Sequence, residues 1–191
     1  MNGKFDYTLR KQSGGPGQYA RVIGRIEPYD DVFAFENRVV GGAIPPAFIK
    51  ACERGFRDAT QTGILAGYPV IGVKVVLEGG ASHPVDSNDR AFRFAACQGF
   101  YQGMATADPI VIEPVMQVNL EVPIDCIGVV QGDLMARRGA IDRLEFDGDR
   151  AVMTARVPLA AMFGYATTLR TLCSGQGQFS MTFSHYQPIR N

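Results

Sequence analysis

In the segment Val115-Met-Gln-Val-Asn-Leu-Glu-Val122, apolar and polar side chains alternate from Met116 onward. Because successive side chains of a strand point to opposite faces of a sheet, the alternation predicts a strand with one solvated face. Apolar residues at helical spacing follow at Ile127, Val130 and Leu134, which predicts a helix after the strand. A new domain is therefore expected to begin near residue 114.

The rest of this second domain follows a regular order. Strands are expected over residues 140–146 and 150–157, and Asp147-Gly148-Asp149 between them is a strong hairpin signal. A second helix is expected from Leu159, Phe163, Ala166 and Leu169, and a last strand from Phe179, Met181 and Phe183. The resulting order, β-α-β-β-α-β, is the ferredoxin-like arrangement.

The first part of the chain predicts a different mixture of strands and helices. Residues 5–12 and 18–27 are expected to form a hairpin around the glycine-rich loop Gln12-Ser-Gly-Gly-Pro-Gly-Gln18. The later elements are expected to be a strand over 32–37, a helix after Pro45-Pro46 that stops at Gly63, a strand over 70–77, and a helix capped by Asp86 that closes at Asp108-Pro109. The whole chain is thus expected to be α+β, with two domains.

Composition excludes several classes of function. The 19 Lys and Arg residues balance the 19 Asp and Glu residues, so any RNA contact must be local and must depend on shape. Four scattered cysteines and two histidines argue against a metal site and suit a reducing compartment, so we expect the cytoplasm. The sequence offers no signal peptide and no apolar stretch long enough for a membrane span, so no membrane partner is expected.

Catalytic residues are not expected in this chain. Asp86, Asp89 and Glu78 lie close in sequence, but Asp86 is better explained as a helix cap than as one of a pair of acid-base carboxylates. The chain also contains no G-x-x-x-x-G-K-[ST] phosphate loop, and without that loop it has no means of holding a nucleoside triphosphate.

Several long phrases of the sequence resemble the C-terminal region of elongation factor G. They are Gln12–Tyr19, Val39–Pro45, Ala66–Val70, Val85–Ser87, Gly132–Gly139, Pro158–Thr167 and Phe183–Tyr186, and together they extend over nearly the whole chain. The resemblance implies that residues 1–113 form the family's fourth domain, an S5-domain-2-like β-α-β module, and that residues 114–191 form its ferredoxin-like fifth domain.

The resemblance also implies where RNA is bound. In the family, two loops at the tip of the fourth domain enter the decoding site, and the matching residues here are Gln12, Ser13, Gly14, Gly15, Gly17 and Gln18 in one loop and Ser82, His83 and Asp86 in the other. Taken without the family, the first loop is simply a hairpin turn and His83 a solvated loop residue. Arg137 and Arg138 are either helix-end residues that offset the helix dipole or a possible ribosome contact.

By the same resemblance, the parent protein is a ribosome-stimulated GTPase whose GTP and Mg²⁺ belong to a domain outside this chain, which itself needs no cofactor. The expected partners are ribosomal RNA and the tRNA and mRNA at the decoding site, and the expected function is translocation by a monomer. The chain is a fragment of such a factor or a stand-alone derivative. Pro16 and Gln176 replace arginines that are usual in the family, so a diverged paralogue in recycling, rescue or ribosome protection stays open; a small-molecule enzyme is a distant third.

Overall fold

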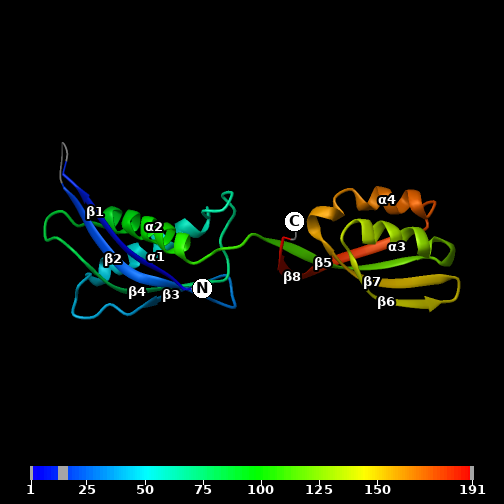
Figure 1. Cartoon of the computed structure of the whole chain (residues 1–191), viewed down its shortest axis with the longest axis horizontal. Coiled ribbons are helices and arrows are strands. Elements are labelled where there is room, and N and C mark those ends of the chain that lie inside the picture. Colours follow the sequence, from blue (N-terminus) through cyan, green and yellow to red (C-terminus); the bar gives the residue numbers. More distant parts are fainter. Residues whose placement is uncertain (1, 13–16, 190–191) are drawn as a thin grey trace. The chain divides into compact units, whose positions relative to one another are not determined.

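The computed structural model describes residues 2–12 and 17–189 of the chain. These residues divide into two compact units, residues 1–110 and 111–191 (Figure 1). Each unit has its own sheet, its own helices and its own apolar core.

The first unit is built on a four-stranded sheet with the order β1-β2-β4-β3. Strands β3 and β4 are parallel and are joined through a helix, whereas the other neighbours pair antiparallel. Its elements are β1 (Gly3–Lys11), β2 (Gln18–Pro28), β3 (Phe33–Asn37), α1 (Pro46–Thr60), β4 (Val73–Ala81) and α2 (Asp89–Thr106). The arrangement contains the expected β-α-β module.

Helices α1 and α2 lie together on one face of this sheet (Figure 1). The core between the two layers includes the fully buried rings of Phe56, Phe92 and Phe100. The two helices approach closely at Gly55, where an added Cβ would lie 2.2 Å from the carbonyl oxygen of Arg93. Glycine is therefore required at this crossing because any side chain would force the helices apart.

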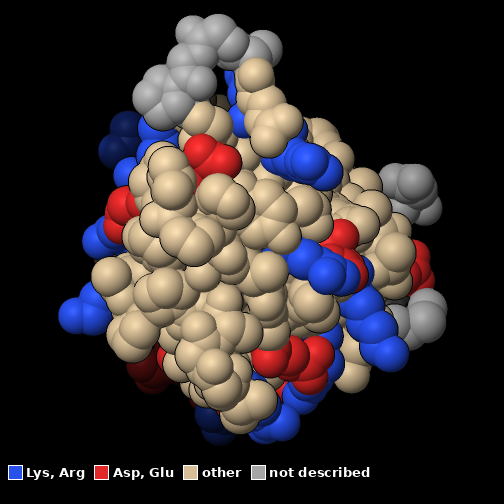
Figure 2. All heavy atoms as spheres, turned by 90° about the vertical axis from the view of Figure 1, so that its left-hand side faces the viewer, with Lys and Arg blue, Asp and Glu red and all other residues tan. Residues whose placement is uncertain are grey.

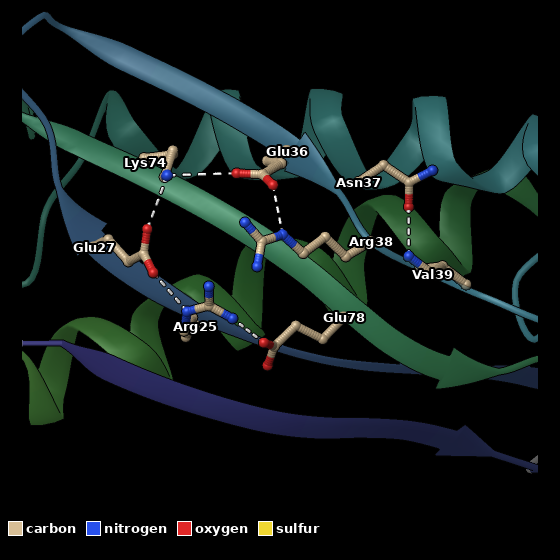
Figure 3. A network of polar contacts seen from close by, with 8 residues as sticks. All are labelled: Arg25, Glu27, Glu36, Asn37, Arg38, Val39, Lys74 and Glu78. Atoms are coloured by element: carbon tan, nitrogen blue, oxygen red, sulfur yellow. Dashed lines mark hydrogen bonds and ion pairs between the residues drawn. The ribbon is translucent and has the colours of Figure 1, made fainter.

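The opposite face of the first sheet carries charged side chains. Arg25 pairs with Glu27 and Glu78, and Lys74 pairs with Glu27 at 2.9 Å and with Glu36 at 3.4 Å (Figure 3). Lys74 and then Arg25 hold the pKa of Glu27 below its usual range. These pairs keep the face charged, as a sheet covered by helices on one side only requires.

One irregularity interrupts the pairing of β2 with β4. Ile23 is opposite Gly79 and Gly24 is opposite Leu77, so Glu78 has no partner on β2. This single extra residue on β4 is a β-bulge, which bends a strand and changes the direction of the side chains beyond it. The bulge lies only a few residues before the end of β4.

The second unit has the expected ferredoxin-like topology. Its antiparallel sheet has the order β6-β7-β5-β8, and α3 and α4 lie over one face (Figure 1). Its elements are β5 (Ile112–Pro123), η1 (Ile124–Cys126), α3 (Ile127–Ala136), β6 (Ala140–Asp147), β7 (Arg150–Pro158), η2 (Leu159–Met162), α4 (Tyr165–Leu172) and β8 (Gln178–Pro188). The buried side chains of Leu120, Leu134, Met153 and Tyr165 join the sheet to the helices.

Three local expectations were wrong or shifted. The helix expected across Leu159–Leu169 is interrupted at Gly164, whose φ of 74° is left-handed, and Phe163 beside it is 77% exposed instead of buried. The cap of α2 is Asn88, which accepts a hydrogen bond from the backbone N–H of Ala91 at 2.9 Å, and not Asp86. Strand β5 begins at Ile112, so the boundary expected after residue 113 falls inside this strand.

Candidate RNA-contacting tip

One end of the first unit's sheet, which we call the tip, is where β1 leads into one loop and β4 leads into another. The first tip loop, residues 12–17, joins β1 to β2, whose pairing continues to Lys11 opposite Gln18. The second tip loop, residues 82–88, follows β4, whose pairing with β2 continues to Ala81 opposite Arg21. Because β4 ends beside the first residues of β2, the sheet itself places the second tip loop next to the start of β2.

Direct contacts join the second tip loop to the start of β2. The hydroxyl of Ser87 donates a hydrogen bond to the carbonyl of Tyr19 at 2.7 Å, and the N–H of Tyr19 donates to the carbonyl of Asp86 at 2.9 Å. Gly17 lies so close to Asp86 that an added Cβ would be 2.6 Å from a carboxylate oxygen. The tip is thus held by bonds between segments that are far apart in the sequence.

The second tip loop is also closed on itself. His83 donates its backbone N–H to the Ser87 hydroxyl at 2.8 Å, and Ser87 returns its N–H to the His83 carbonyl at 3.2 Å. The ring nitrogen Nδ1 of His83 accepts from the backbone N–H of Val85 at 3.3 Å and of Asp86 at 3.1 Å. The His83 side chain is half exposed, so the turn fixes one edge of the ring and leaves the rest accessible.

A hollow of about 160 Å³ lies between these segments. It is lined by Arg10, Gln12, Gln18, Tyr19, His83 and Asp86. Figure 2 faces this end of the first unit and shows small blue and red areas among a larger uncharged surface. The hollow therefore combines one guanidinium, two amides, an imidazole and a carboxylate, which suits hydrogen bonding to phosphate, ribose or base edges better than purely electrostatic attraction.

The residues predicted for RNA binding are partly brought together. Gln12, Gln18, His83 and Asp86 line the same hollow, and Gly17 lies against Asp86. Ser82 directly follows the last residue of β4. Ser13, Gly14 and Gly15 lie outside the described residues.

Sequence reasoning missed Arg10, Tyr19 and Ser87 as parts of this site. Arg10 and Tyr19 are opposite each other in the β1–β2 pair, one position before the last pair, Lys11 and Gln18, that precedes the loop. Counting back symmetrically from the glycine-rich loop would have found them. The contact of Ser87 with Tyr19 had no local signal, because it joins positions 68 residues apart.

Arg137 and Arg138, the possible ribosome contacts, belong to the second unit and are held by bonds within it. Arg137 bonds to Asp133 at 2.7 Å and to Thr168 at 3.1 Å, and its guanidinium lies 4.9 Å from the ring centre of Tyr165. Arg138 makes two hydrogen bonds of 2.9 Å to the buried carboxylate of Glu113. These contacts agree with a structural role, and a ribosome contact stays a prediction.

Neither a metal centre nor a membrane-spanning helix is present among residues 2–12 and 17–189. In that part of the chain no three His, Cys, Asp or Glu residues cluster closely enough to hold an ion. In the same residues, no helix has both the length and the apolar character that crossing a bilayer needs.

Comparison with known proteins identifies the class to which this fold and tip belong. The family model for domain IV of elongation factor G matches residues 1–108, and the model for the elongation factor G C-terminus matches residues 110–191. A crystal structure of a protein from Thermus thermophilus superposes with a TM-score of 0.91 at 39% identity, covering 98% of this chain and 28% of that one.

Two curated relatives are also elongation factors G. The chain is 46% identical to elongation factor G-1, mitochondrial, of Arabidopsis thaliana, and 48% identical to elongation factor G 1 of Syntrophus aciditrophicus (strain SB). The matches cover 98% and 97% of this chain, but only 26% and 27% of those proteins. The chain belongs to the elongation factor G family and spans about a quarter of the length of these two relatives.

Proposed function

We propose that this chain is the ribosome-binding arm of an elongation factor G-type GTPase, and that its tip enters the decoding site to promote movement of tRNA and mRNA. The arm binds and makes no covalent bond. The GTP and Mg²⁺ that power the cycle belong to a domain of the parent protein outside this chain. The parent acts as a monomer in the cytoplasm.

The observation that carries the proposal is the convergence of two loops on one hollow. Gln12 and Gln18 come from the first tip loop and its border, and His83 and Asp86 come from the second. Hydrogen bonds from Ser87 and to Asp86 tie the second tip loop to Tyr19, at the start of β2, before any RNA arrives. A preformed site loses less conformational entropy on binding than a flexible one. This suits a tip that must hold RNA in place.

The proposal is tested by replacing His83 with alanine in the full-length parent factor. His83→Ala removes an accessible ring from the hollow without touching the expected GTPase domain. We expect translocation, measured by rapid kinetics on ribosomes, to slow by about ten-fold or more, which corresponds to the loss of about 1.4 kcal/mol at the transition state. Ribosome-stimulated GTP hydrolysis should stay nearly unchanged.

His185→Ala is the matched control, because it removes the other histidine, which lies on β8 of the second unit. Translocation with this variant should proceed at the wild-type rate. Equal loss of translocation and GTP hydrolysis in His83→Ala would contradict the proposal that the tip acts by binding RNA at the decoding site. If the full-length factor does not promote translocation but recycles or rescues ribosomes, the alternative function as a diverged paralogue is supported instead.

A further inference from the structure

The orientation of the His83 ring carries a more specific inference about the tip, which rests on the proposed function. Nδ1 faces the backbone of its own turn, where the N–H groups of Val85 and Asp86 lie 3.3 and 3.1 Å away. A backbone N–H is always a donor, so two such groups directed at one nitrogen require a lone pair there. Nδ1 is therefore unprotonated.

The carboxylate of Asp86, in contrast, favours a proton on Nδ1. Its Oδ2 is 3.3 Å from Nδ1 and would accept a proton carried there. A proton on Nδ1, however, would point at two N–H groups and would leave both without an acceptor, a loss that one contact to a partly exposed carboxylate does not offset. The two backbone N–H donors therefore outweigh the single carboxylate acceptor, and Nδ1 carries no proton.

In a neutral imidazole, a lone pair on Nδ1 places the hydrogen on Nε2. None of the hydrogen bonds among the described residues engages Nε2, and half of the side chain is exposed beside the hollow. We propose that the turn at residues 83–87 fixes His83 as the neutral Nε2–H tautomer, so that the tip presents a hydrogen-bond donor to an acceptor atom on RNA. The acceptor is a phosphate, ribose or base atom.

Ser87 supports this arrangement as a positioning residue. Its hydroxyl accepts the N–H of His83 and donates to the carbonyl of Tyr19, so it fixes the backbone from which the ring projects. The ring also meets the ring of Tyr19 edge-on, with centroids 6.3 Å apart. These contacts leave the ring few rotamers, and a donor with a fixed direction discriminates better than a mobile one.

The tautomer is tested directly on the 191-residue chain by long-range ¹H–¹⁵N correlation NMR. The chain contains only two histidines, so His185→Gln leaves a single ring to assign. We expect the pattern of a neutral ring with the proton on Nε2 at a pH where the ring is uncharged. A proton on Nδ1 would overturn the inference whatever the factor does on ribosomes.

The donor role is tested by two matched substitutions in the full-length factor. In His83→Asn the amide oxygen replaces Nδ1 as the acceptor of the turn, but the outward donor is lost. In His83→Gln the amide nitrogen reaches the place of Nε2, but the acceptor of the turn is lost. We expect His83→Asn to slow translocation by about ten-fold, the effect of one hydrogen bond, and His83→Gln to slow it less.

The reverse order, with His83→Asn active and His83→Gln as slow as His83→Ala, would overturn the donor role but keep the proposed function. If all three variants translocate like wild type while NMR shows the Nε2–H form, the proposed function fails and only the tautomer stands. Repeating the comparison on an mRNA with 2′-deoxy codons identifies the acceptor. The defect of His83→Asn disappears there if the acceptor is a codon 2′-hydroxyl, and persists if it is a phosphate or base atom.

Discussion

The hydroxyl of Ser87 donates to the carbonyl of Tyr19 at 2.7 Å and so joins the loop after β4 to the first residues of β2. The same oxygen accepts the backbone N–H of His83 at 2.8 Å. One small side chain thus completes hydrogen bonds of two backbone segments that the covalent chain separates by a whole β-α-β crossover. Removing it should loosen the tip and leave the core intact.

Ser87→Ala tests that expectation. Each bond of a hydroxyl contributes about 1 kcal/mol, so the amide of His83 should exchange with solvent about five-fold faster. Hydrogen-exchange NMR measures this, with the amides of the buried core residues Phe56 and Phe92 as internal reference. Ser184→Ala, which removes an exposed hydroxyl of the second unit that bonds to its neighbour His185, is the control. Unchanged exchange at His83 would show that the hydroxyl does not hold the loop.

Gly17→Ala should disturb the tip through Asp86. The new methyl would overlap the carboxylate, and because a carboxylate at the end of a side chain can move, the free energy of unfolding should fall by only about 1 kcal/mol. The amide of Tyr19, which donates to the carbonyl of Asp86, should exchange faster. In an Asp86→Ala background the same substitution should have no effect, and a double-mutant cycle measures the difference. Equal effects in both backgrounds would assign the cost to the backbone of Gly17.

Arg10→Gln should weaken ribosome binding by the full-length factor and flatten its salt dependence. Arg10 lines the hollow, and one lost phosphate contact lowers the slope of log affinity against log salt by about one unit. Arg156→Gln changes the net charge equally, but Arg156 is already paired with Asp142 at 2.6 Å. The slope of Arg156→Gln should match wild type. Equal slopes in the two variants would remove Arg10 from the RNA contact.

Acid should destabilise the second unit through Glu113. Hydrogen bonds from Arg138, followed by one from Gln187, hold the pKa of Glu113 below its ordinary value of 4.5. A carboxylate with a lowered folded-state pKa contributes stability above its unfolded pKa and loses it as pH falls through the folded value. The contribution is therefore complete at neutral pH and is lost progressively as pH falls from about 4.5 through the lower folded-state pKa.

The substitution Glu113→Gln measures this pH-dependent contribution to the stability of the second unit. At pH 7 the variant should lose about 1 kcal/mol, a figure kept small because Arg138 is half exposed. In acid the variant should lose less stability than wild type, so the two unfolding curves should approach each other. Thermal unfolding of the β5 signals by NMR across this pH range measures both. Parallel curves would mean that Glu113 has the same pKa in the folded and unfolded chain.

Periodicity predicted those parts of the fold that depend on neighbouring residues. The alternation over Met116–Val122 lies inside β5, and apolar spacing found α3 from Ile127 onward. Sequence patterns failed to identify the N-terminal cap of α2, where two nearby residues could each serve. Asp86 and Asn88 are both good helix caps, and only the path of the chain, which turns Asp86 toward Gly17, leaves the cap to Asn88.

The candidate site was predicted unevenly for a similar reason. The two loops came from the resemblance to a family, and the position of the second loop beside the start of β2 follows from the pairing of β2 with β4. The hydrogen bonds of Ser87 and the acceptor role of the His83 ring depend on a tertiary arrangement that no spacing of residues encodes. Phe163 shows the opposite failure, because an apolar residue at helical spacing proved to be largely exposed.

Glu78, the extra residue of β4 that has no backbone partner on β2, has a consequence for evolution of the tip. Residues beyond it are displaced by one position relative to β2, so their side chains have exchanged faces of the sheet. Deleting one residue there would restore regular pairing and turn the following loop over, with His83 directed away from Gln18. Sequences that vary freely within the loop should therefore still keep the number of residues between Lys74 and Ser87.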